Sequence, residues 1–318
     1  MSETQDTPIL AVKDLCMCFG DKSGKKGAVK AVDHVSFTVK KGETFGLVGE
    51  SGCGKTTTGR CIMRLYEPSS GEIYYDGQPI HGKMTKKKRK FLTDHIAMVF
   101  QDPMASLNPR MTVQEIIGEG LEMKEKLDDK RRHEIVAKML TRVGLSPEHA
   151  TRYPHEFSGG QRQRIGIARA LAVNPGLIVA DEPLSALDVS VQAQVINLLN
   201  RLKEEMGLTI LFIAHNLSVV KYFSDRVGVM YYGRLVEVAD ADKLFARPAH
   251  PYTRALLSAV PQPDPFLERQ RRKILYDPTV HQYGPGNEPS YHTLEPGHII
   301  YCSDQEFAGF QAAWGEQQ

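Results

Sequence analysis

Short apolar runs alternate along the chain with segments of helical periodicity. The three clearest runs cover residues 44–48, 177–180 and 209–214. Each is apolar at consecutive positions, as expected of a strand that is covered on both faces of a sheet. Strands that alternate with helices in this way predict an α/β fold with a mostly parallel sheet flanked by helices. Each run ends in polar residues, which is where open sheets of this kind bind ligands.

Two further regions lie between these strands or before them. Residues 9–39 predict short strands around a hairpin-like loop, because a Gly/Lys-rich stretch over residues 21–27 interrupts the apolar pattern. We expect these strands to form an N-terminal antiparallel β subdomain. Helical periodicity runs from Asp102 to Phe157 and predicts a helical insertion. We place the resulting helical subdomain over residues 102–165.

The periodic pattern weakens after His250. Prolines at positions 261, 263 and 265 break any helix there, and an irregular stretch rich in Pro, Gly and His follows. We therefore expect one large domain over residues 1–262 and an irregular C-terminal tail over residues 263–318.

Composition narrows the class of protein. With 318 residues, of which 41% are hydrophobic, the chain is long enough for one large domain with an appendage. Its 40 basic and 38 acidic residues leave a net charge of +2, which gives no whole-chain attraction for nucleic acid. Residues 1–10 lack the basic start and apolar core of a secretory signal, and no run approaches the roughly 18 apolar residues of a spanning helix. We expect a globular chain that does not itself cross a membrane.

Cysteines and a basic run offer two further candidates. The cysteines are sparse and odd in number, which fits a reducing cytoplasm: Cys16, Cys18, Cys53, Cys61 and Cys302. A metal half-site at Cys16 and Cys18 is the less favoured interpretation, because the alternation around them predicts a strand and no second ligand pair follows. The basic run over residues 83–90 has no interleaved aromatic residues to stack bases, so it indicates a solvated helix face.

The segment that follows the apolar run at residues 44–48 has the pattern of a phosphate-binding P-loop. Glycines at this spacing let backbone N–H groups converge on phosphate oxygens, and the helix that follows presents its positive end. Lys55 is placed to meet the β and γ phosphates, and Thr56 to supply an oxygen to magnesium. The predicted nucleotide-binding residues are Gly49, Glu50, Ser51, Gly52, Cys53, Gly54, Lys55, Thr56 and Thr57.

The second apolar run delivers two acids at its end. Asp181 is our candidate magnesium ligand, directly or through water. Glu182 is our candidate general base for a water that attacks the γ phosphate. Two acids after a strand also occur as helix caps, but the P-loop in the same chain favours the catalytic interpretation.

A second anion site is predicted at residues 157–164, which read FSGGQRQR. A hydroxyl, two glycines and the start of a helix provide N–H groups for an anion. One domain does not need two such sites for one phosphate, so we expect the second to serve a neighbour's nucleotide. The segment resembles the ABC signature LSGGQ, with Phe157 replacing its first Leu. The candidate residues are Ser158, Gly159, Gly160 and Gln161.

The resemblance to the ABC family covers nearly all of residues 9–265 and implies a RecA-like P-loop NTPase core. By that resemblance Gln101 is the Q-loop glutamine, which touches magnesium and water, and Asp188 belongs to the D-loop, which crosses the dimer interface. His215 matches the switch histidine that senses the γ phosphate, although Asn216 replaces the Asp that usually follows it. Phe19 sits where the family places an aromatic ring under adenine. The implied cofactors are ATP and Mg²⁺, and the catalytic set is Lys55, Gln101, Glu182 and His215.

Two stretches narrow the family further. Residues 100–110 (FQDPMASLNPR) and 250–261 (HPYTRALLSAVP) look like the ATPase subunits of bacterial dipeptide and oligopeptide importers. The second stretch is a strong marker of that group, and nickel and some other small-solute importers share it. The resemblance implies a sister ATPase, most simply as a heterodimer, two transmembrane permeases and an extracytoplasmic binding protein, at the cytoplasmic face of the inner membrane. No residue of the chain specifies the solute. The alternative is a soluble ABC ATPase that works in repair or translation. Such proteins typically carry two cassettes or nucleic-acid elements, whereas this sequence has one cassette, so this alternative is less favoured.

The tail offers one cysteine, Cys302. We therefore expect no iron–sulfur cluster there, since such a cluster normally takes four thiolates. Zinc held by Cys302 with His281, His292 and His298 is the less favoured alternative, because their spacing is irregular. We expect residues 283–300 to pack against the core or the sister subunit.

Overall fold

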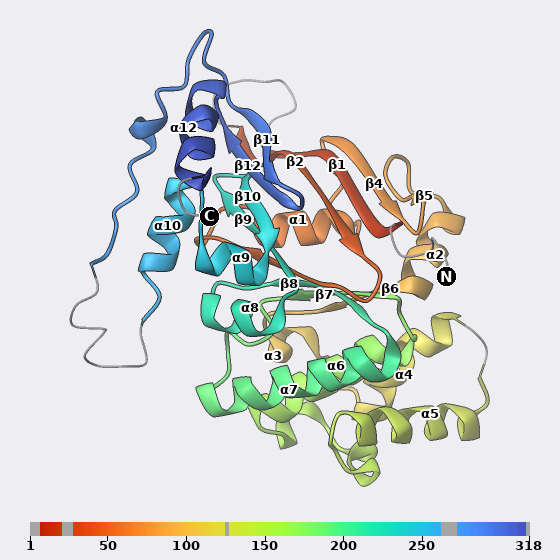
Figure 1. The fold of residues 1–318 in the computed structure, drawn as a ribbon. Coiled ribbons are helices and arrows are strands. Elements are labelled where there is room, and N and C mark those ends of the chain that lie inside the picture. Colours follow the sequence, from red (N-terminus) through yellow and green to blue (C-terminus); the bar gives the residue numbers. More distant parts are fainter. Residues whose placement is uncertain (1–6, 21–27, 125–126, 262–271, 316–318) are drawn as a thin grey trace, which may run out of the picture.

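The computed structural model describes residues 7–20, 28–124, 127–261 and 272–315. Two sheets organise the chain (Figure 1). The smaller sheet is antiparallel where its strands pair, and has the order β2-β1-β4-β5. Its strands are β1 (Pro8–Phe19), β2 (Val29–Lys40), β4 (Ser70–Tyr75) and β5 (Gln78–Pro79). This confirms the predicted antiparallel N-terminal region.

The larger sheet is mixed and has the order β11-β12-β10-β9-β3-β8-β7-β6. Neighbours from β9 to β6 pair in parallel, and the remaining pairs at the β11 end are antiparallel. The three runs predicted from the sequence are β3, β7 and β8, and all five positions of each are buried. The strands are β3 (Thr44–Val48), β6 (Ile96–Val99), β7 (Leu177–Asp181), β8 (Thr209–Ile213), β9 (Arg226–Tyr231), β10 (Arg234–Asp240), β11 (Ser290–Glu295) and β12 (His298–Cys302).

Alternate residues of one strand serve two hydrophobic cores, because successive side chains point to opposite faces. In β8, Ile210 and Phe212 belong to the core shared with the helical region, while Leu211 and Ile213 belong to the core under the smaller sheet. The helix α1 (Lys55–Ile62) packs on this second face, where a Cβ added at Gly59 would lie 2.7 Å from Ile213.

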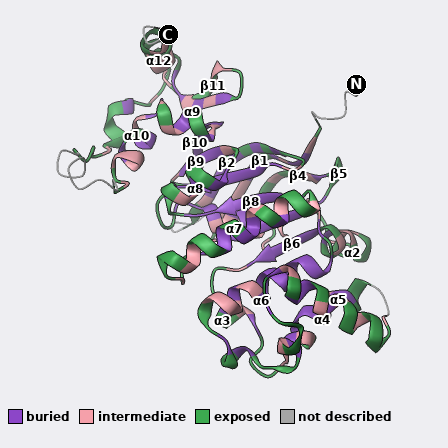
Figure 2. Cartoon of the chain, turned by 60° about the horizontal axis from the view of Figure 1, so that its bottom comes forward, coloured by how far each residue is buried: buried purple, intermediate pink, exposed green. Residues whose placement is uncertain are grey.

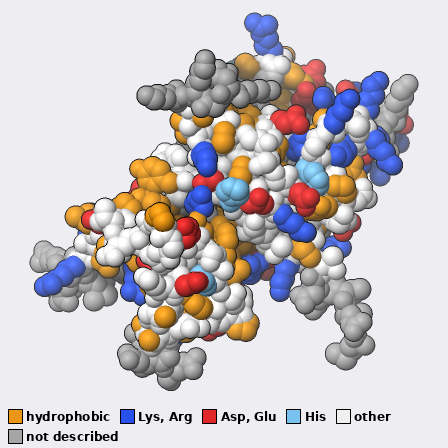
Figure 3. Space-filling model, turned by 90° about the horizontal axis from the view of Figure 1, so that it is seen from above, with side chains coloured by type: hydrophobic (Ala, Val, Ile, Leu, Met, Phe, Trp, Pro, Cys, Tyr) orange, Lys and Arg blue, Asp and Glu red, His pale blue; other side chains and the backbone are white. Residues whose placement is uncertain are grey.

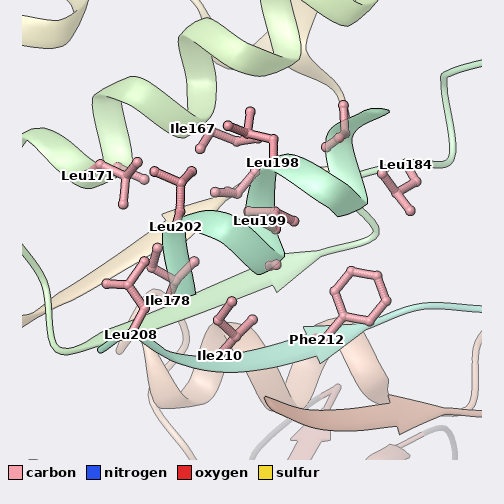
Figure 4. Close-up of a cluster of buried hydrophobic side chains, with 14 of the residues drawn as sticks. Ile167, Leu171, Ile178, Leu184, Leu198, Leu199, Leu202, Leu208, Ile210 and Phe212 are labelled. Atoms are coloured by element: carbon pink, nitrogen blue, oxygen red, sulfur yellow. The ribbon is translucent and has the colours of Figure 1, made fainter. Parts of the chain in front are cut away.

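Helices form a separate layer at the other face (Figures 1 and 2). The long helix α7 lies between α6 and the sheet: Figure 4 shows its Leu198, Leu199 and Leu202 between Ile167 and Leu171 of α6 and Ile178, Ile210 and Phe212 of the strands. The helices of this region are α3 (Pro103–Ser106), α4 (Val113–Lys124), α5 (Asp129–Arg142), η1 (Pro147–Thr151), η2 (Pro154–Glu156), α6 (Gly159–Ala172) and α7 (Val189–Met206).

The described residues form further helices outside this region. They are α2 (Lys86–His95), α8 (Leu217–Phe223), α9 (Ala241–Ala246), α10 (Pro251–Ser258), η3 (Pro278–His281) and α12 (Asp304–Gly315). One of them, α8, packs against the central strand β3. Most of the predicted basic run lies on α2, and most of its charged side chains are exposed, as the sequence indicated. No helix within the described ranges is long and apolar enough to span a membrane.

The tail is more regular than the sequence predicts. Residues 272–289 are mostly irregular, but β11 and β12 then form a hairpin that joins the main sheet through β10. The turn between them contains Gly297, whose φ of 82° favours glycine. The helix α12 closes a small core with Phe307, Phe310 and Trp314 packed against Ile300 and Cys302. The expected irregular tail was therefore wrong for residues 290–315.

Candidate functional site

The loop behind β3 has a backbone that requires glycine at two positions. Gly49 has a φ of 147° and Gly54 a φ of 107°. A Cβ at Gly49 would lie 2.2 Å from the carbonyl oxygen of Met230, and one at Gly54 would lie 2.2 Å from that of Ala31. The loop is therefore pressed against the ends of β9 and β2, and α1 begins directly behind it at Lys55.

Lys55 closes this loop on itself. Its Nζ donates hydrogen bonds to the carbonyl oxygens of Gly49 and Glu50, at 2.8 and 2.9 Å, and the side chain is buried. Burial raises the pKa of the neighbouring Cys53 thiol, although the Lys55 ammonium opposes this shift. The cation thus rests on two neutral oxygens, which it can exchange for charged phosphate oxygens of a ligand.

A hydroxyl and a carboxylate meet beside the loop. Thr56 Oγ1 donates to Asp181 Oδ1 at 2.8 Å, and Asp181 is the buried last residue of β7. Burial raises the pKa of Asp181, while the bond from Thr56 lowers it. Two ligand oxygens of an octahedral Mg²⁺ lie about 2.9 Å apart when each is about 2.1 Å from the ion. The spacing and the all-oxygen donor set therefore fit magnesium.

Three polar side chains converge at the carboxyl ends of β6, β7 and β8. Gln101 Nε2 donates to Glu182 Oε2 at 3.0 Å, and His215 Nδ1 lies 3.2 Å from the same oxygen. Glu182 has a φ of 45°, a left-handed conformation that is strained for a non-glycine residue. Its N–H is fixed by the carbonyl oxygen of Ile213 at 2.9 Å. Strain of this kind persists only where neighbouring structure holds it, and it is common at functional sites.

Asn216 has a structural role of its own. Its side chain accepts hydrogen bonds from the N–H groups of Ser218 and Val219, at 3.1 and 3.5 Å, and so caps α8. Asn caps helices as well as Asp does. The replacement therefore preserves the turn that presents His215.

The signature segment begins α6 with a reciprocal cap. Ser158 N–H donates to Gln161 Oε1 at 3.0 Å, and Gln161 N–H donates to Ser158 Oγ at 3.3 Å. Gly160 is needed where α7 crosses, because a Cβ there would lie 2.5 Å from Val191. Ser158 and Gly159 are exposed. No hydrogen bond among the described residues joins this segment to the P-loop.

Asp188 and Phe19 also face solvent. Asp188 precedes α7 without a side-chain cap bond, and the following Val189 is 82% exposed. Phe19 ends β1 with its ring 40% exposed, and its ring meets that of Tyr66 edge-on at 5.5 Å between centroids. Both side chains are thus available for contacts outside the described chain.

One contact to the P-loop was not predicted. The N–H of Glu50 donates to the hydroxyl of Tyr252 at 3.2 Å, and Tyr252 is fully buried on α10. Its ring packs against those of Tyr231 and Tyr276, at 4.4 and 5.3 Å between centroids. In the sequence, residues 250–261 indicated only a resemblance to peptide importers. The contact of Tyr252 with Glu50 could not be predicted, because the two residues are 202 positions apart.

The start of α10 rests on a buried carboxylate. Glu237 accepts hydrogen bonds from the N–H groups of Ala249 and His250, at 2.8 and 3.0 Å. His298 Nε2, from tail strand β12, lies 2.7 Å from Glu237 Oε1, and both side chains are fully buried. The tail is thereby connected through Glu237 and α10 to the P-loop.

Comparison with known proteins agrees with this geometry. Residues 32–185 match the family "ABC transporter" and residues 236–286 match "Oligopeptide/dipeptide transporter, C-terminal region". The oligopeptide transport ATP-binding protein OppF of Bacillus subtilis (strain 168) is 58% identical over 286 residues, which cover 90% of this chain and 94% of that protein.

The chain belongs to the oligopeptide transport ATP-binding proteins of the ABC transporter family.

A second member of this family is AmiF of Streptococcus pneumoniae serotype 4 (strain ATCC BAA-334 / TIGR4). It is 53% identical over 304 residues, which cover 95% of this chain and 97% of that protein. Among solved structures, the ATP-binding cassette MJ0796, a dimer bound to ADP and Pi, is similar with a TM-score of 0.66 and 29% identity, over 73% of this chain and 98% of that one. These likenesses show the cassette fold that the sequence predicted.

The structure brings the predicted residues of this oligopeptide cassette into two groups. Gln101, Glu182 and His215 form one, and Thr56 with Asp181 forms the other. Predicted roles for the signature, Asp188 and Phe19 stay predictions, because their partners lie outside the described chain.

The tail histidines each have a carboxylate of their own. His281 Nδ1 lies 2.6 Å from Glu306, and His292 Nε2 lies 3.5 Å from Asp304. His298 contacts Glu237, and Cys302 is buried with its pKa raised to about 12 by burial. On the face seen from above, histidine side chains lie beside acidic ones (Figure 3). The division into residues 1–262 and 263–318 stays a prediction.

Proposed function

We propose that this chain binds Mg·ATP and hydrolyses it to drive an oligopeptide importer. The observation that carries the proposal is the joint contact of Glu182 with Gln101 and His215, at the sheet edge that also bears the P-loop and Asp181. A carboxylate held by two polar partners beside a phosphate-binding loop is the arrangement required to activate a water.

The P-loop residues hold the nucleotide. Lys55 exchanges its two carbonyl partners for β- and γ-phosphate oxygens, and the N–H groups at the start of α1 face the phosphates. Thr56 and Asp181 hold Mg²⁺, with Gln101 nearby. The ion, when bound, neutralises charge that develops on the β and γ phosphates.

Glu182 acts as the general base. Its carboxylate accepts a proton from water as the water oxygen attacks the γ phosphorus, while the bond from that phosphorus to the bridging oxygen breaks and ADP leaves. The amide of Gln101 and the ring of His215 hold that carboxylate in place, and His215 is placed to sense the γ phosphate. Phe19, exposed at the end of β1, offers its ring to adenine.

The active site is completed by a second cassette. The start of α6 is exposed at Ser158 and Gly159 and makes no hydrogen bond to the P-loop among the described residues. We therefore assign the signature residues Ser158, Gly159, Gly160 and Gln161 to the nucleotide of a sister ATPase. Asp188, which is exposed at the start of α7, is assigned to the same interface between the two cassettes. Two permeases and an extracytoplasmic binding protein complete the transporter, with this chain at the cytoplasmic face of the membrane.

The test is ATP hydrolysis and peptide uptake by the reconstituted transporter with Glu182→Gln. We expect hydrolysis to fall about 10²- to 10⁴-fold while ATP binding persists, since only the base is removed. The matched control is Glu204→Gln, an exposed carboxylate on α7, which should retain both activities. Hydrolysis by Glu182→Gln at the wild-type rate would remove Glu182 from the catalytic role.

A nucleotide-bound structure of the assembled transporter tests the shared site. We expect each γ phosphate to contact Lys55 of one cassette and the signature of the other. If Ser158 lay far from every γ phosphate, the shared site would be excluded, whatever the result for Glu182.

A further inference from the structure

Three potential metal ligands that have no role in the proposed ATPase site meet between β1 and β2. The Sγ of Cys16, a carboxylate oxygen of Asp33 and a ring nitrogen of His34 all lie within 4.8 Å of one another. Among the residues that the structure describes, this is the one group of three or more such ligands. Cys18 is not part of it, so the two cysteines singled out in the sequence do not act together.

Asp33 is held with one oxygen directed at the cluster. It is buried, and its Oδ2 pairs with Arg234 Nη2 at 2.5 Å. The other oxygen, Oδ1, lies 3.7 Å from His34 Nε2 and 3.5 Å from Lys30 Nζ. The side chain of Lys30 is 63% exposed and can move into solvent, so Oδ1 is available to a cation at this position.

His34 is oriented by a second carboxylate. Its Nδ1 lies 2.6 Å from Asp14 Oδ1, which can accept a ring N–H, and its Nε2 faces Asp33. Metal-binding histidines almost always make such an outer hydrogen bond, because it fixes the tautomer and the ring.

The thiol of Cys16 completes the set. Its sulfur accepts the backbone N–H of His34 at 3.3 Å, and its S–H donates to the carbonyl oxygen of Asp14 at 3.7 Å. The register of β1 against β2 shifts on both sides of Leu15, next to Cys16. This irregularity lies beside Cys16, whose sulfur contacts the backbone of His34 in β2.

We propose that Cys16, Asp33 and His34 bind one Zn²⁺ ion, with solvent as the fourth ligand. Sulfur, imidazole nitrogen and carboxylate oxygen are the ligand types of zinc, whereas Mg²⁺ and Ca²⁺ prefer oxygen alone. Zinc–ligand distances of about 2.0–2.3 Å place tetrahedral ligand atoms about 3.3–3.8 Å apart. The 3.7 Å between His34 Nε2 and Asp33 Oδ1 is slightly longer than the roughly 3.3–3.6 Å expected for one nitrogen and one oxygen ligand, so these two groups need to move only a little closer. The half-exposed side chain of His34 leaves an entry path for the ion.

The site lies where the tail meets the smaller sheet. Tyr291 of β11 donates to the carbonyl oxygen of His34 at 3.5 Å, and Arg234, which holds Asp33, also contacts Tyr301 of β12. Figure 1 shows both tail strands beside β2. A bound ion therefore stabilises the junction of β1, β2 and the tail hairpin.

Zinc binding to the tag-free full chain, stripped with chelator and free of nucleotide, tests the proposal. Titration with ZnCl₂ against a competing chelator should give one ion per chain. Cobalt should add a thiolate-to-metal charge-transfer band. We expect Cys16→Ser and His34→Gln to weaken zinc affinity at least about 100-fold, and Asp14→Asn to weaken it about 10- to 100-fold.

Cys18→Ser is the matched control, because it removes the neighbouring thiol and leaves the proposed ligands in place. It should keep zinc affinity and the cobalt band. ATP binding and circular dichroism, measured for every variant, separate a lost ligand from a lost fold. The proposal is overturned if wild type binds no stoichiometric zinc, if Cys16→Ser binds it as well as wild type, or if Cys18→Ser loses it equally. Binding without the cobalt band would also overturn it.

Discussion

Tyr252→Phe removes one hydroxyl that touches the P-loop. In the native chain this hydroxyl accepts the N–H of Glu50 at 3.2 Å, and burial raises the pKa of the phenol well above its usual range, so the group stays neutral. Phe fills the same space, because Tyr252 is fully buried among aromatic rings. The variant thus tests the hydrogen bond with little change of packing.

The magnitude follows from the value of one hydrogen bond. A net contribution of about 0.5–1.5 kcal/mol corresponds to a factor of about 2 to 12 in an equilibrium constant. We expect the Kd for Mg·ATP to rise by this factor, because the loop must be ordered by the nucleotide instead of by Tyr252. The turnover of bound ATP should not change, since Glu182 is untouched.

Isothermal titration with a non-hydrolysable ATP analogue measures the effect. The control is Tyr276→Phe, which belongs to the same aromatic cluster but whose hydroxyl contacts His281 Nε2 at 2.8 Å. It should leave the Kd unchanged. Unchanged or tighter binding by Tyr252→Phe would refute the reasoning, because it would mean that the Glu50 N–H leaves Tyr252 when nucleotide is bound.

Three stability predictions, each measured by urea unfolding, concern other contacts. Leu199→Ala, in the core between α6 and the sheet, should cost about 2–5 kcal/mol, whereas Leu65→Ala at an exposed position should cost less than about 0.5 kcal/mol; equal losses would contradict the packing. Glu237→Ala leaves His298 and two buried N–H groups without a partner and should cost about 3–5 kcal/mol; a loss below about 1 kcal/mol would show that the pair is not buried as described. Burial chiefly lowers the pKa of His250 from 6.5 to about 3, so wild-type stability should fall as pH decreases through this window, where only the unfolded state takes up the proton. His250→Asn should remove that dependence, and an unchanged pH profile would assign it to another group.

The sequence predicted the central strands and the polar residues at their ends, because both depend on neighbouring positions in the chain. Strands β3, β7 and β8 are buried at all positions, so their apolar runs carried the signal of strands covered on both faces. The residues at their ends followed from chain order, because parallel strands place all their carboxyl ends at one edge. The proximity of Gln101, Glu182 and His215 could therefore be anticipated, although their individual bonds could not.

Contacts between residues far apart in the sequence could not be predicted in this way. The strand β12 forms because β10 presents an edge to it, and Tyr252 reaches Glu50 across 202 positions of sequence. The cluster at Cys16 needed the register of β1 against β2, which a shift next to Leu15 sets. Propensity and motif describe a residue's neighbours in sequence, and none of these contacts is between such neighbours.

The late position of β12 has a consequence for synthesis of the chain. Until residues 298–302 are made, β10 carries an unpaired edge, and Glu237 has no imidazole beside it. Exposed edges of this kind pair readily with other chains. A nascent cassette therefore remains prone to aggregation and to proteases until its final hairpin docks, so chains interrupted before this point should be cleared rather than assembled into transporters.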